Sequence, residues 1–160
     1  MIRLCVNGEE RELAIAPDVP LLYVLRNDLG LKSPKLGCGL EQCGACRVLV
    51  DGDAVPSCRL PVEAVVGKRV VTLEGLGSEA EPHPLQRAFL AENAGQCGYC
   101  VAGILISAAA LLQRCARPSP GEIKAALCSN LCRCGSQPRF LRAIARAAAE
   151  CSQSGGAADD

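Results

Sequence analysis

The chain has 160 residues, enough for one ordinary domain or two small ones, and its 17 basic and 17 acidic side chains cancel in charge. A balanced charge gives no electrostatic basis for binding nucleic acid or an anionic membrane surface. The sequence has 12 cysteines but only two phenylalanines, two tyrosines and no tryptophan. We therefore expect a hydrophobic core of Val, Leu, Ile and Ala, with an additional group that holds it together.

The N-terminal segment MIRLCVNGEERELAI lacks the long apolar region and small-residue cleavage site of a signal peptide. This favours a reducing, cytoplasmic compartment, where structural disulfides are rare. The most apolar run, VAGILISAAALL at 101–112, has 12 residues, whereas a bilayer-spanning helix needs about 20. We expect a buried helix there, and association with the inner membrane only through a partner.

The first part of the chain, residues 1–74, has the pattern of a small sheet domain. Asn7-Gly8 and Asp51-Gly52 each predict a hairpin, because both positions of such a turn tolerate a positive φ. Apolar residues between 21 and 29 fall at helical spacing, and Gly30 suits the end of that helix. Strands are expected at 2–6, 12–15, 47–50, 54–57 and 69–73.

The remainder of the chain has a helical pattern. Residues 75–82 are rich in Gly, Ser, Pro and acidic side chains and are predicted to form a linker. Ser119 before Pro120 is a good N-cap, since proline fits the first helical position. His83 before Pro84 is expected to cap a helix, not to act as a ligand or proton relay. Within residues 83–150, helices are expected at 84–93, 101–114, 120–127 and 139–150; residues 151–160 are expected to be a disordered tail.

The segment GCGLEQCGACRVLVDGDAVPSC has the cysteine spacing of plant-type 2Fe-2S proteins, C-x4-C-x2-C and a distant fourth cysteine. A tight loop of this kind wraps its backbone N–H groups around the inorganic sulfides, and small residues allow the close approach. Structural zinc sites usually take two short C-x2-4-C pairs instead, so zinc is the weaker alternative. The predicted ligands are Cys38, Cys43, Cys46 and Cys58; the small residues are Gly37, Gly39, Gly44 and Ala45.

A second set of cysteines lies at junctions between predicted helices, as C-x2-C and a distant C-x-C. On spacing alone, zinc remains a serious competitor to iron and sulfide for this set. Disulfides fit poorly with a reducing compartment. The set comprises Cys97, Cys100, Cys132 and Cys134. The four other cysteines, Cys5, Cys115, Cys128 and Cys151, are expected to be small buried hydrophobic side chains.

Three motifs, GCGLEQCGAC, QCGYC and NLCRCG, in this order, resemble the small iron–sulfur subunit of the molybdenum hydroxylases, the xanthine oxidase family. The resemblance covers about residues 1–150, and two motifs together are more specific than either alone. It implies an α+β fold: an N-terminal β-grasp, plant-type ferredoxin-like domain followed by a C-terminal four-helix bundle. Each domain would hold one 2Fe-2S cluster, the second on Cys97, Cys100, Cys132 and Cys134.

The resemblance also implies a role and partners. The chain would be the electron-transfer subunit of a molybdenum-containing hydroxylase or dehydrogenase, with no catalytic residue of its own. A large partner subunit would hold the molybdopterin, in its cytosine dinucleotide form, and Gln96 and Cys134 would contact the pterin. The alternative for Gln96 is a solvated loop amide. Electrons would pass from the helical-domain cluster to the β-grasp cluster and then to an FAD subunit or a cytochrome c subunit or domain.

The sequence departs from the family pattern at two places. Glu41 stands where relatives commonly have glycine, and Val-Ala-Gly-Ile at 101–104 stands where many have Thr-Pro-Gly-Met. Neither change removes a ligand. The two changes place the chain away from the xanthine and carbon monoxide branches of the family, and CRCGSQPR resembles two-subunit bacterial enzymes such as nicotinate, isoquinoline or aldehyde dehydrogenases. Two other classes remain open, a free-standing soluble ferredoxin and a zinc-binding interaction module.

Overall fold

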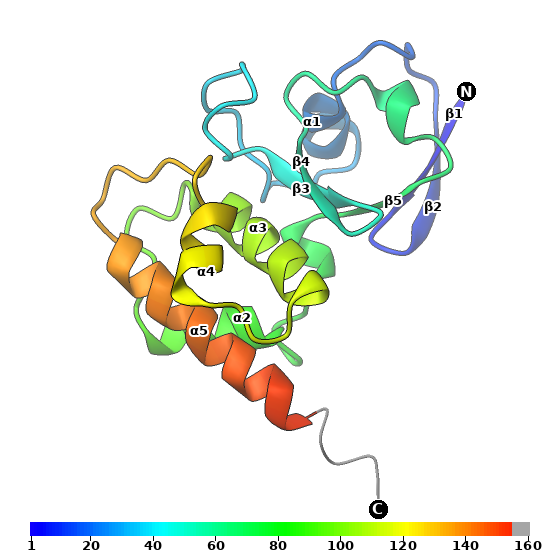
Figure 1. The fold of residues 1–160 in the computed structure, drawn as a ribbon. Coiled ribbons are helices and arrows are strands. Elements are labelled where there is room, and N and C mark those ends of the chain that lie inside the picture. Colours follow the sequence, from blue (N-terminus) through cyan, green and yellow to red (C-terminus); the bar gives the residue numbers. More distant parts are fainter. Residues whose placement is uncertain (155–160) are drawn as a thin grey trace, which may run out of the picture.

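The structure is a computed structural model, and it describes residues 1–154 (Figure 1). A five-stranded sheet in the order β2-β1-β5-β3-β4 forms the N-terminal part. β1 pairs in parallel with β5, and the other neighbouring strands are antiparallel. The strands are β1 Ile2–Val6, β2 Glu9–Leu13, β3 Arg47–Val50, β4 Asp53–Pro56 and β5 Arg69–Val71.

The two hairpins form at the predicted turns, but β2 lies earlier than expected. Asn7 and Gly8 both have positive φ, 52° and 81°, so pairing resumes at once with Val6 opposite Glu9. The predicted strand at 12–15 was therefore placed three residues too late at its start. β2 has the sequence EEREL at the edge of the sheet, where one polar side chain after another leaves no apolar alternation to detect.

A short helical segment covers one face of the sheet (Figure 1). It consists of α1, Leu21–Tyr23, which continues as the π-helical turn η1, Val24–Asp28. Its apolar side chains enter a core that contains Leu4, Val48 and Val70 from the strands. The pattern that predicted a helix between 21 and 29 is therefore confirmed.

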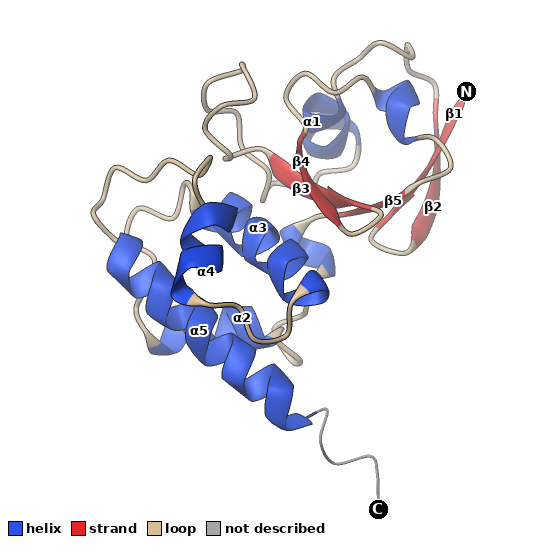
Figure 2. Ribbon diagram, in the orientation of Figure 1, coloured by secondary structure: helices blue, strands red, loops and turns tan. Residues whose placement is uncertain are grey.

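The opposite face of the sheet packs on the helical part of the chain. Successive side chains of a strand point to opposite faces. Val48 and Val50 accordingly join the core under α1, whereas Leu49 joins the core of the helical part. The partner helix is α3, Val101–Arg114, which lies along β3 and β4. Figure 2 shows α3 between the sheet and the remaining helices.

Four helices make up the C-terminal part: α2 Pro84–Ala91, α3, α4 Pro120–Ala126 and α5 Gln137–Ser154. Ser119 and His83 both cap helices as predicted: Ser119 Oγ accepts from the Glu122 amide, and His83 Nδ1 accepts from the Leu85 amide at 3.2 Å. Between α2 and α5, the rings of Phe89 and Phe140 stack with their centroids 5.7 Å apart.

α5 is longer than predicted at both ends. It starts two residues early because the Ser136 carbonyl accepts hydrogen bonds from the amides of Arg139 and Phe140, and Pro138 is tolerated in a first turn. It also includes residues 151–154, which were expected to belong to the tail. The rest of that predicted tail, residues 155–160, lies outside the described residues.

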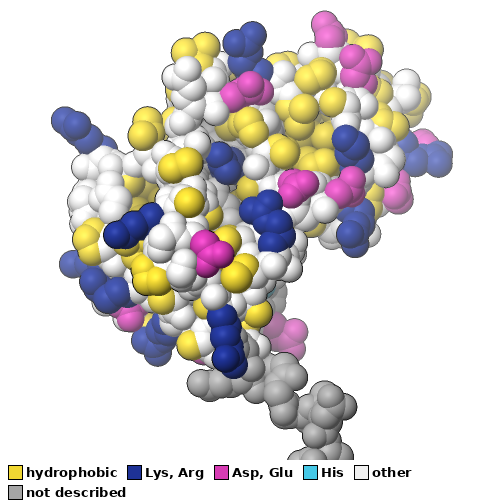
Figure 3. Space-filling view, viewed as in Figure 1, with side chains coloured by type: hydrophobic (Ala, Val, Ile, Leu, Met, Phe, Trp, Pro, Cys, Tyr) yellow, Lys and Arg dark blue, Asp and Glu magenta, His cyan; other side chains and the backbone are white. Residues whose placement is uncertain are grey.

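The described helices include none that is long and apolar enough to cross a bilayer. On the face shown in Figure 3, basic side chains predominate over the helical part and mix with acidic ones over the sheet.

Candidate metal centres

The first cysteine motif forms a loop between η1 and β3 that directs backbone amides at sulfur. The amides of Leu40 and Gln42 each lie 3.3 Å from Cys38 Sγ, and the amide of Cys38 lies 3.3 Å from Cys43 Sγ. The loop achieves this with three positive φ angles, at Gly39, Glu41 and Gly44. Glu41, where the family pattern has glycine, therefore takes a backbone conformation that glycine adopts without strain.

These amides change the chemistry of the loop. The hydrogen bonds from Leu40 and then Gln42 lower the pKa of Cys38 to about 7, because an N–H donor stabilises the thiolate. The thiolate is the form that binds metal. Gly37 closes the loop on its inner side, since a Cβ there would come within 2.5 Å of Cys43 Sγ. Only glycine fits this position without moving the cysteine.

The two other cysteines of the motif lie deeper. Cys46 and Cys58 are both buried and share a small cluster with Leu22 of α1. Their thiols are direct neighbours, and burial followed by the contact with Cys46 raises the pKa of Cys58. The site is thus made of two adjacent pairs of thiols, Cys38 with Cys43 near the surface and Cys46 with Cys58 inside.

The second set of cysteines converges between the start of α3 and the loop before α5. Here too the thiols form two pairs, Cys97 with Cys134 and Cys100 with Cys132. The Tyr99 amide and then the Cys134 thiol lower the pKa of Cys97, whereas burial and then the Cys132 thiol raise the pKa of Cys100 to about 12. An outer pair and an inner pair of thiols therefore occur at this site as well.

The pairing tests which metal group the thiols fit. Among the described residues, no group of three Cys, His, Asp or Glu side chains that could hold a single metal ion is found, and the thiols of each site lie as two pairs. A 2Fe-2S cluster is held by four thiolates, two on each of its two irons, which calls for two pairs of thiols next to each other. All 12 cysteines are free thiols, so disulfides do not compete. The donor set at both sites fits a 2Fe-2S cluster.

The buried thiols add a second argument. A thiol that is buried, like Cys58, or half-buried, like Cys100, resists ionisation because the thiolate charge is poorly solvated, and burial raises the pKa of both. Such a thiol becomes a thiolate when a metal cation supplies the missing positive charge. Cation binding is therefore what these inner positions are suited for.

The segments that carry the two sites pack closely against each other at two glycines, Gly44 and Gly103. A Cβ on Gly103 of α3 would come within 2.0 Å of the Gly44 carbonyl oxygen, and a Cβ on Gly44 would meet Ser129 and Asn130 at 2.6 and 2.5 Å. The hydroxyl of Ser107, one turn after Gly103, accepts a hydrogen bond from Arg47 and donates one to Asn130 Oδ1 at 2.9 Å. Sequence reasoning missed this contact zone, and glycine within the apolar run was its only signal.

Gln96, predicted to contact the pterin, is exposed in the loop after α2, directly before Cys97. Because the Cys97 and Cys134 thiols are neighbours, Gln96 and Cys134 lie on the same side of the second site. Of the four remaining cysteines, Cys5, Cys115 and Cys151 are half-buried, whereas Cys128 is exposed, with Sγ 3.7 Å from Ser129 Oγ. The prediction of a buried Cys128 is wrong, because α4 ends two residues before it.

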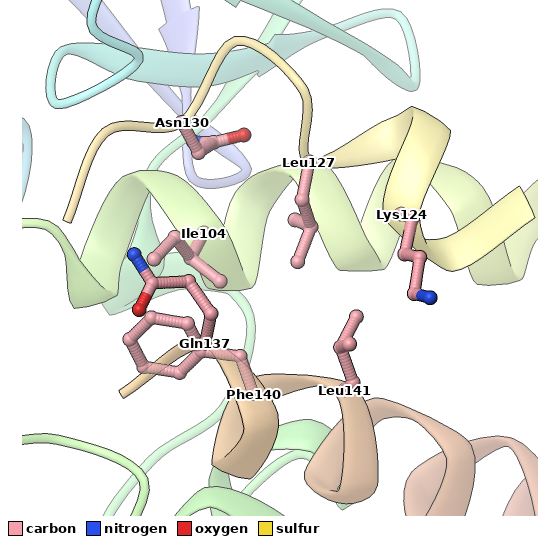
Figure 4. Close-up of a pocket in the computed structure, with 7 residues that line it drawn as sticks. All are labelled: Ile104, Lys124, Leu127, Asn130, Gln137, Phe140 and Leu141. Atoms are coloured by element: carbon pink, nitrogen blue, oxygen red, sulfur yellow. The ribbon is translucent and has the colours of Figure 1, made fainter. Parts of the chain in front are cut away.

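An apolar pocket of about 300 Å³ lies between α3, α4 and α5, beside the second site (Figure 4). Gln137, on its wall, donates to the Cys132 carbonyl at 3.0 Å, which ties the pocket to the cysteine loop. Among its lining residues, Lys124 alone carries a charge. The pocket therefore offers apolar contact and no acid–base pair. It is lined by Ile104, Lys124, Leu127, Asn130, Gln137, Phe140 and Leu141.

Comparison with protein families finds two iron–sulfur domains in this chain. Residues 4–71 match the 2Fe-2S iron-sulfur cluster binding domain, and residues 72–145 match a second 2Fe-2S binding domain. A nicotinate dehydrogenase subunit of Pseudomonas putida is 53% identical over 92% of this chain and 94% of its own length. The alpha subunit of isoquinoline 1-oxidoreductase from Brevundimonas diminuta is 46% identical over 94% of this chain and 99% of its own.

Solved structures show the same fold. The aldehyde oxidoreductase of Desulfovibrio desulfuricans superposes with a TM-score of 0.92 at 39% identity, covering 95% of this chain but only 17% of that longer chain. Quinoline 2-oxidoreductase from Pseudomonas putida 86 gives a TM-score of 0.90 at 34% identity, covering 96% of both chains. The chain therefore belongs to the family of small 2Fe-2S subunits of the molybdenum hydroxylases, the xanthine oxidase family.

Proposed function

We propose that this chain is an electron-transfer subunit whose two cysteine sites each hold a 2Fe-2S cluster. Each cluster, when bound, supplies a one-electron redox centre. The protein's own residues hold the thiolates in two pairs per site and aim backbone amides at sulfur, and this pairing is the observation that carries the proposal. The first site takes Cys38, Cys43, Cys46 and Cys58; the second takes Cys97, Cys100, Cys132 and Cys134.

The division of the chain follows from this assignment. Residues 1–74 would hold the first cluster and residues 83–150 the second, with 75–82 as the linker. Iron and acid-labile sulfide analysis tests the assignment: about two irons and two sulfides are expected per site. Protein that binds zinc without sulfide would refute it and would favour the interaction module instead.

We propose that a large partner subunit holds the molybdenum cofactor next to the second site. Gln96 is exposed beside Cys97, and Cys134 is paired with Cys97, so both could reach a pterin bound to the partner, in its cytosine dinucleotide form. Electrons would enter at the second site and leave from the first to an FAD or cytochrome c acceptor. Any contact with a membrane would be made through a partner.

The test of Gln96 is the rate at which substrate reduces the second site in the intact complex. Gln96→Ala should slow this reduction, whereas Gln42→Ala, an exposed amide beside Cys43 in the other loop, should not. If substrate reduced the second site equally fast in the Gln96→Ala and Gln42→Ala complexes, Gln96 would have no role in passing electrons to that site.

The surface around the sites supports partner binding. Leu36, Leu40, Tyr99 and Leu131 are large apolar side chains that are 42%, 56%, 50% and 66% exposed, and all four belong to the cysteine loops or adjoin them. Clustered exposed apolar side chains mark interaction sites. We propose that residues 96–101 and 131–135 are covered in an interface of about 2,000 Å² or more in total. Hydrogen exchange that is equally fast at these loops in the free chain and in the complex would contradict the proposal.

The names of the relatives extend the proposal to a substrate class. Relatives at 53% and 46% identity are named for nicotinate and isoquinoline. We propose that the partner oxidises an N-heteroaromatic ring, and purified complex assayed with nicotinate, isoquinoline and a simple aldehyde would test this. Turnover of the aldehyde alone would contradict it.

A further inference from the structure

Arg47 is a cation with almost no partner inside the molecule. It begins β3, directly after Cys46, and its side chain is half-buried against α3. Its Nη1 donates to Ser107 Oγ at 3.4 Å, a long hydrogen bond to a neutral hydroxyl. Its Nε is buried without any partner, and none of the described carboxylates forms an ion pair with it.

This arrangement is costly unless a negative charge lies nearby. The arginine guanidinium stays protonated at all accessible pH values, so it cannot escape burial by losing its proton. Buried charges in proteins are normally paired or hydrogen-bonded. Arg114, at the end of α3, illustrates the contrast, since it is exposed and its Nη1 lies 3.4 Å from Asp53 Oδ1. Arg47 has no such carboxylate in the part of the chain that the structure describes, so an anion close by would stabilise its half-buried charge.

The position of Arg47 identifies that anion. The Cα atoms of Arg47 and Cys46 are about 3.8 Å apart, and Cys46 supplies an inner thiol of the first site. The guanidinium then contacts Ser107, which pairs with Asn130, two residues before Cys132 of the second site. It therefore lies in the contact zone where Gly44 of the first loop packs against Gly103. Four thiolates bind at the first site, which makes that site anionic.

We infer that Arg47 is the fixed positive charge that offsets the negative charge of the first iron–sulfur site and raises its midpoint reduction potential. The inference rests on the proposed function. One-electron reduction adds one negative charge to the site, and a nearby cation stabilises the reduced form more than the oxidised form. Half-burial strengthens this attraction and weakens its screening by salt. The second site is linked to Arg47 only through Ser107 and Asn130, so its potential changes less.

The test is a redox titration of the intact complex, following the paramagnetic signal of each reduced site. Arg47→Gln removes the positive charge, and Arg47→Met removes it while keeping an apolar side chain of similar length. The test can be made with either variant, provided that the complex still shows the paramagnetic signals of both sites. We expect the equilibrium constant for reduction of the first site to fall about tenfold, which is about 59 mV for one electron. Arg47→Lys should keep the wild-type potential to within about threefold in this constant, about 28 mV.

Arg114→Gln is the matched control, because it removes an exposed arginine and changes the net charge of the chain equally. It should leave both potentials unchanged. Unchanged potentials in Arg47→Gln or Arg47→Met, or a larger shift at the second site than at the first, would overturn the inference even if stability falls. A wild-type complex without both signals would instead overturn the proposed function, so the two failures are distinguishable.

Discussion

The backbone amide of Leu131 donates a hydrogen bond to the carbonyl oxygen of Cys43 at 3.0 Å. Leu131 directly precedes Cys132 of the second site, and Cys43 belongs to the first. The two cysteine loops, far apart in sequence, are therefore joined by their main chains. Because Gly103 and Gly44 also meet without any intervening side chain, the separation of the two sites is fixed by backbone contacts.

Removing the Leu131 amide should loosen this junction. Leu131→Pro lacks the N–H group and should lower the free energy of unfolding by about 1 kcal/mol, the usual net value of one hydrogen bond. It should also slow electron passage between the sites, measured by stopped-flow spectroscopy of the complex. Leu131→Ala keeps the amide and controls for loss of the apolar side chain. Identical stability and rates in the two variants would show that the hydrogen bond does not hold the junction.

The glycine contact should tolerate no side chain. Gly103→Ala would place Cβ 2.0 Å from the Gly44 carbonyl oxygen, which is backbone and cannot rotate away. We expect a loss of at least about 2 kcal/mol in the free energy of unfolding, the range seen for overpacked cores. Urea denaturation measures it.

The control for Gly103→Ala is Gly121→Ala, also a helical glycine. Its Cβ would lie 3.8 Å from Ser119 Oγ, an ordinary contact. Alanine favours a helix over glycine by up to about 1 kcal/mol, so Gly121→Ala should be neutral or stabilising. A Gly103→Ala variant as stable as Gly121→Ala would contradict the close packing of α3 on the first loop.

Glu74 should make stability depend on pH. Its carboxylate accepts from the amides of Lys32 and Ser33 and from Thr72 Oγ, tying the segment after β5 to the start of the cysteine loop. Burial raises its pKa, but the hydrogen bonds from Ser33 and Thr72 outweigh this and leave the pKa below the ordinary value of 4.5. The ionised form therefore stabilises the fold above pH 4.5, and this stabilisation is lost as the pH falls through the lowered pKa.

Glu74→Gln should accordingly lower the free energy of unfolding at pH 7 by about 1 kcal/mol, a value reduced by partial exposure. The difference from wild type should shrink as the pH falls below 4.5. Glu79→Gln, an exposed linker carboxylate, is the control and should show no such trend. A Glu74→Gln deficit that is constant from pH 7 to pH 3 would contradict the account.

Local signals in the sequence predicted most of the elements. Strand β3, the hairpin turns and helix α3 were predicted with correct positions because apolar spacing and turn chemistry are local properties. Edge strand β2 was misplaced because its exposed side chains carry no alternation. The end of α5 was predicted too early, since the small and polar residues after Glu150 mark no helix end by themselves.

The candidate sites were predictable in part for the same reason. Cysteine spacing indicated which thiols form each group, but for the second set it did not separate zinc from iron and sulfide. The pairing of Cys97 with Cys134 depends on how α3 meets the loop before α5, which no local pattern encodes. No local pattern predicts the environment of Arg47 either, because its side chain becomes half-buried, with no carboxylate partner among the described residues, only when β3 packs on α3.

The central claim is that the two cysteine sites hold separate clusters, wired in the order second site, first site, acceptor. Cys43→Ser tests it, because a hydroxyl is a much poorer iron ligand than a thiolate and Cys43 belongs to the first site alone. The iron, the sulfide and the two paramagnetic signals of the purified complex show whether only the first cluster is lost.

The decisive measurement is single turnover of the Cys43→Ser complex with substrate, followed by addition of the natural acceptor. The account predicts that substrate still reduces the second site, seen as its own paramagnetic signal, while transfer to the acceptor collapses. A complex that assembles without the first cluster yet reduces the acceptor at the wild-type rate would contradict the account.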